Sequence, residues 1–295
     1  GAHLWSMRAG GFGFDIGRGV AMDASGNVAV TGFFNGGTDF GGGLLPYTSV
    51  NDIFVAMLSG VNGSHVWSKG FGGSLNTDDH GSAIAVDASG NVLVAGDFLG
   101  TVNFGGGDLT NNVVDAFVVK FSGANGAHLW SRTLVFNDTL RESVRMAVET
   151  SGNVAVTVRS DFNNVQSTVK LAGTNGSELW PNSIIGNLTG QGVTVDANGN
   201  VLVTGRFVGT VNFGGGNLTS AGLDDVFVIK FSGTDGSHIW SKRFGSTSSD
   251  QGFAVAVDAS NSVVVTGFFS GTVNFGGGNL VSAGAEDIFL LKLRR

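Results

Sequence analysis

The sequence predicts an all-β protein built from five copies of one four-stranded antiparallel unit, and three observations carry this prediction. Five segments follow the pattern Gly-x-His/Glu-x-Trp and hold all five tryptophans, at Gly1–Trp5, Gly63–Trp67, Gly126–Trp130, Gly176–Trp180 and Gly236–Trp240. The repeats that begin there cover the whole chain, as 1–62, 63–125, 126–175, 176–235 and 236–295. Apolar residues fall in short strand-like runs between glycine-rich turns, without a 3.6-residue period. Such repeats are typical of propeller blades, so we predict one five-bladed β-propeller domain over 1–295.

The fifth copy shows the elements of one repeat most clearly. Its first strand is expected over Gly252–Asp258 and is rich in small residues, and a tight turn follows at Ala259–Asn261. The second strand is expected over Val263–Phe268. A glycine-rich connection over Gly271–Leu280 then leads to a third strand at Asp287–Lys292.

The fourth strand of each blade is the one that bears tryptophan. In Val226–Lys242, for example, the third strand runs through a glycine-containing loop into this strand, as in a hairpin. The chain opens with such a strand, Ala2–Arg8, and closes with a third strand, Asp287–Leu293. We therefore predict that the N-terminal strand completes the last blade and closes the ring like a Velcro strip, which leaves no open sheet edge.

Composition narrows the classes of function. Only 13% of residues are charged and the net charge is −7, so a nucleic-acid partner is not expected. No apolar stretch approaches the roughly 18–20 residues of a membrane helix, so we expect no membrane insertion. Cysteine is absent, which excludes disulfides and thiol chemistry. The chain starts at Gly1 inside a repeat, so any targeting segment is expected outside it.

Two recurring motifs resemble a known bacterial repeat. Ala85–Gly96 reads Ala-Val-Asp-Ala-Ser-Gly-Asn-Val-x-Val-Ala-Gly, and Asp115–Lys120 and Asp225–Lys230 share the pattern Asp-x-Phe-Val-x-Lys. These motifs resemble the SBBP β-propeller repeat, with a degenerate third copy. The resemblance implies a bacterial secreted or cell-surface protein and no defined activity. The family name refers to seven blades, whereas this chain has five repeats.

Propeller geometry indicates which repeated residues can cooperate. Strands lie ~4.8 Å apart, so equivalent positions on neighbouring blades should be about 8 Å apart on innermost strands and about 25 Å apart on outermost ones. Four histidines recur two residues before a tryptophan, at His3, His65, His128 and His238. They lie on outer strands, so we interpret them as packing beside their tryptophans and predict no metal site.

The residues that lead into the first strands can converge at the mouth of the channel. Asp15, Asp79 and Asp250 occupy one repeat position, where the third copy has Arg141, and Arg145 follows four residues later. These five residues are our candidate ligand-binding site for a polar ligand or an ion. The alternative is that each aspartate caps its own Asp-x-Gly turn and the arginines balance the charge.

Glycine triplets follow the second strand in four repeats. They are not phosphate loops, because no Gly-x-x-x-x-Gly-Lys-Ser/Thr pattern occurs and no helix follows them. We expect small hairpins there, on the side of the channel mouth. The third copy lacks the triplet, which would leave a notch beside Arg141, Arg159 and Asp161.

These features favour a non-catalytic binding or interaction module whose partner is an unknown protein or glycan. We predict no catalytic residues, no metal and no cofactor, and we expect a monomer. One alternative is a glycosidase-like enzyme, since paired carboxyls ~5–9 Å apart can hydrolyse glycosidic bonds. The other is a structural spacer without a ligand.

Overall fold

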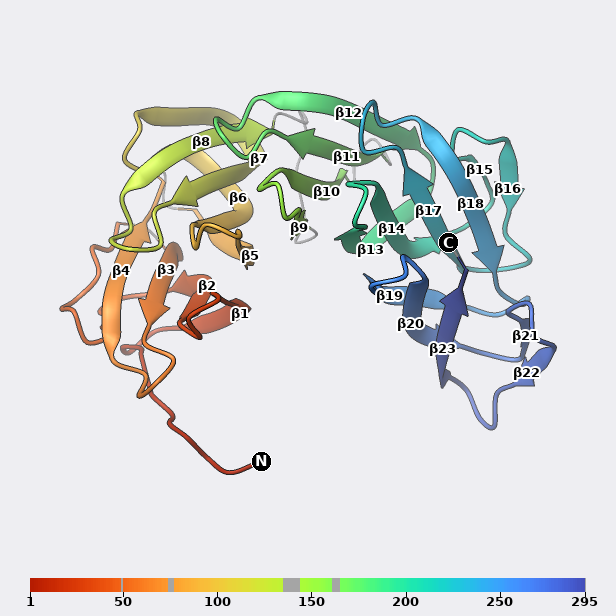
Figure 1. Ribbon diagram of the computed structural model, residues 1–295, viewed down its shortest axis with the longest axis horizontal. Helices are drawn as coiled ribbons and strands as arrows, with labels where there is room; N and C mark the ends of the chain where they lie inside the picture. The colour runs from red at the N-terminus through yellow and green to blue at the C-terminus, as the bar shows by residue number, and fades with distance from the viewer. Residues whose placement is uncertain (49, 74–76, 135–143, 161–164, 295) are drawn as a thin grey trace. The chain divides into compact units, whose positions relative to one another are not determined.

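The computed structural model describes residues 1–48, 50–73, 77–134, 144–160 and 165–294 (Figure 1). These residues form strands, turns and extended segments, and none of them is helical. The all-β prediction is therefore confirmed, and the described part of the chain contains no helix that could cross a membrane. The chain divides into two compact units, Gly1–Gly152 with Gly173–Gly176, and Asn153–Ala172 with Ser177–Arg295. The single domain over 1–295 stays a prediction.

The first unit contains two four-stranded antiparallel sheets whose strands follow one another in sequence. The first sheet consists of β1 (Ile16–Met22), β2 (Val28–Phe34), β3 (Asp52–Leu58) and β4 (His65–Phe71). The second sheet consists of β5 (His80–Val86), β6 (Val92–Asn103), β7 (Asp108–Phe121) and β8 (His128–Leu134). Strand β9 (Arg145–Val148) also belongs to this unit.

The second unit repeats the same plan. Its third sheet holds β10 (Val154–Ser160), β11 (Val165–Leu171) and β12 (Glu178–Ile185). The fourth sheet holds β13 (Leu188–Val195), β14 (Val201–Phe207), β17 (Asp225–Phe231) and β18 (His238–Phe244), and the last sheet holds β19 (Gln251–Val257), β20 (Val263–Phe269) and β23 (Asp287–Leu293). Two small hairpins, β15 (Thr210–Asn212) with β16 (Asn217–Thr219) and β21 (Thr272–Asn274) with β22 (Asn279–Val281), interrupt the fourth and last sheets.

Neighbouring sheets pack face to face through their β-branched and aromatic residues. In the first unit Ile53 and Val55 of β3 are fully buried in one cluster with Val92 and Val94 of β6. In the second unit Val226 and Val228 of β17 pack in the same way with residues of the last sheet. Successive four-stranded antiparallel sheets that bury both faces in this manner are the building blocks of a β-propeller.

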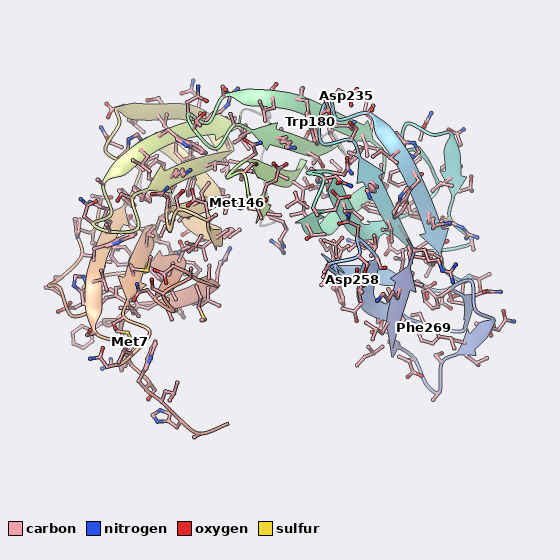
Figure 2. The ribbon with its side chains drawn as sticks, viewed as in Figure 1. Met7, Met146, Trp180, Asp235, Asp258 and Phe269 are labelled. Carbon is pink, nitrogen blue, oxygen red and sulfur yellow. The ribbon has the colours of Figure 1, made fainter. Side chains whose placement is uncertain are left out.

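The tryptophans tie each sheet to the following one. Trp67 on β4 donates its indole N–H to the carbonyl of Gly123 at 2.7 Å, and Trp180 on β12 (Figure 2) donates to Gly233 at 3.1 Å. Four of the indoles, those of Trp5, Trp67, Trp130 and Trp180, also cover a glycine of the following hairpin, where an added Cβ would touch the ring, as at Gly126 beneath Trp67. The prediction that these residues belong to the core is confirmed for Trp67, Trp130 and Trp180, which are 4–6% exposed.

The turn between the first and second strands is held by its aspartate and by a lysine from the third strand. Asp87 accepts backbone N–H groups of Ser89 and Asn91 at 2.9 Å, and Lys120 Nζ lies 2.7 Å from its second oxygen. Burial raises the pKa of Asp87, but the hydrogen bonds from Lys120 and Asn91 outweigh it and lower that pKa. The same ion pair recurs between Lys230 and Asp196, both buried.

The glycine triplets do form hairpin turns, but they lie against the fourth strand of their own sheet. The imidazole of His128 on β8 covers Gly106, the middle glycine of its triplet, and its Nε2 lies 3.0 Å from Ser131 Oγ. This contact supports the structural role that the sequence predicts for these histidines. Their packing beside the tryptophans stays a prediction.

The N-terminal residues 1–11 do not pair with any strand in the described part of the chain. The last sheet accordingly has three strands there, with β23 at its edge (Figure 1). The closure of the last blade by this segment stays a prediction.

Candidate functional site

Each of the three predicted aspartates uses its carboxylate to join two loops. Asp79 is fully buried, and its two oxygens accept the backbone N–H groups of Gly73 at 2.6 Å and Leu99 at 3.0 Å. Asp250 is equally buried and accepts from Ser246 at 2.7 Å and Ser270 at 2.9 Å. These donors lie 4–20 residues from each aspartate and not in its own Asp-x-Gly turn, so the carboxylates link separate loops instead of capping that turn. The oxygens that a ligand would need already hold the backbone.

Asp15 also joins two loops, but one of its two donors is a side-chain hydroxyl and not a backbone N–H. Its carboxylate accepts the backbone N–H of Gly11 at 2.8 Å and the hydroxyl of Thr38 at 2.7 Å. Asp15 and Asp79 belong to the first unit, and Asp250 belongs to the second unit. A ligand-binding role for the three acids stays a prediction.

The burial of Asp79 changes the pKa of its carboxyl group. Burial raises its pKa to about 7, against the lowering effect of the two backbone hydrogen bonds, and the charges of Asp52 and Asp97 raise it further. Asp79 is therefore a buried carboxyl that changes charge near neutral pH.

The predicted arginines divide between described and undescribed residues. Arg141 lies outside the described residues, as does Asp161 of the predicted notch. Arg145 stands at the start of β9 and is partly buried. Burial lowers its pKa, and the charge of Arg18 on β1 lowers it further, so two guanidinium groups act on each other in the first unit. Arg159 instead donates to the Leu188 carbonyl within the second unit.

Charged and aromatic side chains from β1, β2, β5 and β6 lie near Arg18 in the first unit. The guanidinium of Arg18 lies 5.0 Å from the ring centroid of Phe33, in the geometry of a cation–π contact. The other neighbour of Phe33 is His80, at 4.9 Å and edge-on. His80 Nδ1 lies 3.0 Å from Asp97 Oδ2, and both side chains are at most 13% exposed. We call Arg18, Phe33, His80, Asp97 and Arg145 the arginine–histidine cluster.

Local strand geometry explains how these side chains meet. His80 and Asp97 face each other in the β5–β6 ladder. The β1–β2 register shifts between Gly17 and Gly19, so Arg18 sits in a β-bulge that turns its side chain away from the regular alternation. Ser82 occupies the equivalent bulge of β5. Bulges of this kind re-aim side chains and are frequent beside binding sites.

Two buried polar atoms beside the cluster lack a hydrogen-bond partner among the described residues. They are Asp97 Oδ1 and the hydroxyl of Ser82. A buried carboxylate oxygen without a donor is destabilising by roughly 1–3 kcal/mol, so a water molecule or another donor would stabilise this oxygen.

Sequence reasoning missed most of this cluster. Gly19 and Arg145 share a repeat position, whereas Arg18 lies one residue before Gly19. The role of Arg18 is not visible in the sequence because a bulge shifts the side-chain alternation by one residue. A signal was present at His80, which is the single histidine of five outside the His-x-Trp pattern. Its pairing with Asp97 depends on the strand register, which the sequence did not reveal.

The chemistry available here is recognition of an anion. The two guanidiniums of Arg18 and Arg145 carry positive charge here in a chain whose net charge is −7, with the carboxylate of Asp97 beside the imidazole of His80. Guanidinium groups bind carboxylates and phosphates through paired N–H donors, and stacking on an aromatic ring holds them in place. The described residues contain no group of three or more His, Cys, Asp or Glu side chains that could hold a metal ion.

Comparisons with known proteins give a weak and partial picture. No family model matches the chain. An uncharacterized WD repeat-containing protein of Acanthamoeba polyphaga mimivirus is 30% identical over 107 residues, which cover 29% of this chain and 8% of that protein. The chain thus corresponds to less than a tenth of that relative's length.

Solved structures with some likeness include two with long coverage of this chain. A quinohemoprotein alcohol dehydrogenase from Pseudomonas putida is 12% identical, with 89% of this chain and 40% of that chain covered and a TM-score of 0.43. A regucalcin, a calcium-binding protein from Agrobacterium tumefaciens, is 13% identical, with coverages of 85% and 81% and a TM-score of 0.31. Likeness at these scores carries no argument about the activity of this chain.

Proposed function

We propose that this chain is a non-catalytic binding module, a five-bladed β-propeller that recognises a carboxylate-bearing partner at the arginine–histidine cluster. The observation that carries the proposal is the stack of Arg18 on Phe33 beside the His80–Asp97 pair. Arg145 lies near enough to Arg18 for the charge of Arg18 to lower the pKa of Arg145. The partner is a protein or a glycan, and the acidic group is the feature that both would share.

Support for five blades comes from the repeats and the sheets. The sequence has five tryptophan-bearing repeats. The described residues form five large antiparallel sheets, one for each repeat of the strand pattern, which is the number expected for a ring of five blades.

The sequence motifs also support a proposal about where the protein acts. The resemblance to the SBBP repeat supports a secreted or cell-surface domain of a bacterial protein, and we propose that it acts as a monomer. The WD-repeat description of the viral relative supports an interaction module, although that relative shares only a short segment.

Binding of short acidic probes tests the proposal. An acidic glutamate peptide and a uronic-acid oligosaccharide are added to the chain at low and at high salt, and affinity is measured by calorimetry. We expect at least one probe to bind, with affinity that falls as salt screens the arginines. Arg18→Gln and Arg145→Gln should each weaken binding about tenfold or more, which equals about 1.4 kcal/mol. Lys242→Gln, which removes an exposed cation on β18, is the matched control for net charge.

The two probes separate the kinds of partner, and their joint failure contradicts the proposal. Binding of the peptide alone indicates a protein partner, and binding of the oligosaccharide alone indicates a glycan. If neither probe binds, or if the arginine variants bind as well as the wild type, the cluster is structural. The spacer interpretation would then be preferred.

One observation favours the glycosidase-like alternative. A buried carboxyl with a pKa of about 7, as at Asp79, is what a general acid in glycoside hydrolysis needs. Both of its oxygens are engaged by backbone N–H groups, however, which argues against proton transfer to a sugar. Hydrolysis of the bound oligosaccharide that disappears in Asp79→Asn would establish the enzyme and replace our proposal.

A further inference from the structure

A cavity of about 370 Å³ lies in the first unit where β5 and β9 end. It is lined by residues of the turn 87–91, by residues 150–152 and 173–174, and by Lys120, Leu129 and Trp130. All of these residues belong to the first unit. His80 begins β5 and Asp87 follows its end, so the cavity lies roughly 20 Å from the arginine–histidine cluster along that strand (Figure 1). A small molecule in this cavity would therefore not contact the cluster.

The floor of the cavity carries a buried ammonium group with one unused donor. Lys120 is 7% exposed, and its Nζ lies 2.7 Å from Asp87 Oδ2 and 2.7 Å from the carbonyl oxygen of Gly173. Among the described residues Lys120 has these two partners, whereas an ammonium group has three N–H donors. The Gly173 oxygen also accepts the indole N–H of Trp130 at 3.1 Å, so it is fully used. A buried donor without an acceptor is unfavourable, and an oxygen atom in the cavity would stabilise it.

The rim of the cavity supplies hydroxyl groups and an apolar wall. Ser89, Thr150 and Thr174 are exposed, and each hydroxyl can donate and accept a hydrogen bond. Leu129 is 48% exposed, and it lines the cavity together with the buried indole of Trp130. The cavity therefore combines a few polar groups with apolar surface in a concave site, as small-molecule sites do.

The charges at the floor decide which class of ligand fits. Among the residues that line the cavity only Lys120 and Asp87 are charged, and they form an ion pair without net charge. An ionised ligand would lose its hydration here without meeting an opposite net charge. A neutral ligand with several hydroxyls can accept from the unused ammonium donor and exchange hydrogen bonds with the rim. Its C–H groups would then lie against Leu129 and Trp130.

We propose that this cavity is a binding site for a neutral sugar unit of monosaccharide size. Lys120 Nζ donates to one sugar oxygen, and the hydroxyls of Ser89, Thr150 and Thr174 bind the others at the rim. This proposal does not rest on recognition of acidic groups at the arginine–histidine cluster.

The first repeat provides a matched comparison within the same unit. Residues 23–27 and 87–91 share the sequence Asp-Ala-Ser-Gly-Asn. Met57 faces Trp67 in the β3–β4 ladder, whereas Lys120 faces Trp130 at the same place in the β7–β8 ladder. The two identical turns therefore differ in the ammonium group beneath them, and the first turn serves as the control for the second.

Ligand-observed NMR on the whole chain tests the proposal with neutral probes. The probes are methyl β-glucoside, methyl β-galactoside, methyl α-mannoside and N-acetylglucosamine, each titrated at low and at high salt. We expect at least one probe to bind, with an affinity that salt does not change, because the ligand is uncharged. Glucosamine, which carries an ammonium group, should bind no more tightly than N-acetylglucosamine. Tighter binding of glucosamine would overturn the assignment to neutral sugars.

A bulky side chain at the rim locates the site. Ala88→Trp places an indole at the mouth of the cavity and should weaken binding about tenfold or more, because it fills space that the sugar needs. Ala24→Trp makes the same change on the identical turn of the first repeat and should leave binding unchanged. Unfolding in urea checks that both variants are folded. Binding that survives Ala88→Trp, or an equal loss in Ala24→Trp, would overturn the proposal.

Loss of a single rim hydroxyl gives a second, conservative test. Thr174→Val keeps the size of the side chain and should weaken binding about fivefold, the effect of one hydrogen bond. Thr234→Val changes the matching loop of the fourth repeat and should have no effect. Equal affinities of these two variants, or no binding of any probe to the wild type, would contradict the site. Arg18→Gln should leave sugar binding unchanged, so this proposal and that of the acidic partner fail separately, and a loss in Arg18→Gln would place the sugar elsewhere.

Discussion

The contact between His128 and the middle glycine of its triplet predicts a stability effect whose sign changes with the partner residue. In the wild type the imidazole lies where the Cβ of Gly106→Ala would be placed. The ring or the hairpin must therefore move, and overpacking of this kind typically destabilises by about 1–3 kcal/mol. Movement of the ring also threatens the hydrogen bond of His128 Nε2 to Ser131 Oγ at 3.0 Å, worth about 1 kcal/mol.

A second effect opposes this loss. Gly106 has no positive φ, unlike Gly105 and Gly107 on either side, so alanine fits its backbone. Alanine there stabilises by about 0.4–1 kcal/mol because it restricts the unfolded chain. Since the hairpin turn is exposed and can shift, we expect a net loss of about 1–2 kcal/mol for Gly106→Ala.

A double-mutant cycle with His128→Ala isolates the contact. In that background the methyl group meets no ring, so Gly106→Ala should be neutral or should stabilise by up to about 1 kcal/mol. Urea unfolding of the wild type, the two single variants and the double variant measures all four free energies. An equal loss in both backgrounds would refute the reasoning, because it would show that the imidazole does not occupy the space above the glycine.

Three further predictions concern the core, the turns and pH. Trp130→Ala should lower the free energy of unfolding by roughly 3–5 kcal/mol in chemical denaturation, since it empties a buried contact between sheets. Lys230→Met should destabilise by roughly 3–5 kcal/mol because it leaves Asp196 charged and buried, and the double variant with Asp196→Leu should recover most of that loss; no recovery would contradict the ion-pair argument. For Asp79 the folded pKa of about 7 lies above the unfolded value of 3.8, so its contribution to stability is complete below about pH 4 and is lost as pH rises through 7. Unfolding measured from pH 4 to 8 should show the advantage of wild type over Asp79→Asn shrinking by up to about 4 kcal/mol, and a constant difference would contradict the shift.

The strands were predictable because their pattern is local. The expected strands Gly252–Asp258, Val263–Phe268 and Asp287–Lys292 correspond to β19, β20 and β23, and no strand end differs by more than one residue. Alternation of apolar residues, the Asx-containing turns and the glycines between them decide the elements without long-range information. The aspartates that precede the first strands were located equally well, but the sequence did not reveal that they join separate loops instead of capping their own turns.

The candidate site was less predictable because it depends on register and on packing between sheets. Arg18 reaches Phe33 through a β-bulge, and His80 meets Asp97 across a ladder, from positions 17 residues apart in sequence. The contact of three repeated histidines with glycine triplets was also not apparent from the sequence. The imidazoles of His65, His128 and His238 each lie over a glycine 22 or 23 residues earlier, Gly42, Gly106 and Gly215.

The sequence by itself determined the repeat, the all-β class and the order of strands within each repeat, since short-range patterning and turn chemistry suffice for these. Only the tertiary structure decided what the side chains at repeated positions do. In the structure the aspartates accept hydrogen bonds from backbone amides, the histidines lie over glycine triplets and the lysines pair with turn aspartates. Each of these contacts joins elements that are distant in the chain. A contact of that kind depends on which strand pairs with which and in what register, and this is set by the burial of whole sheet faces together and not by any one segment.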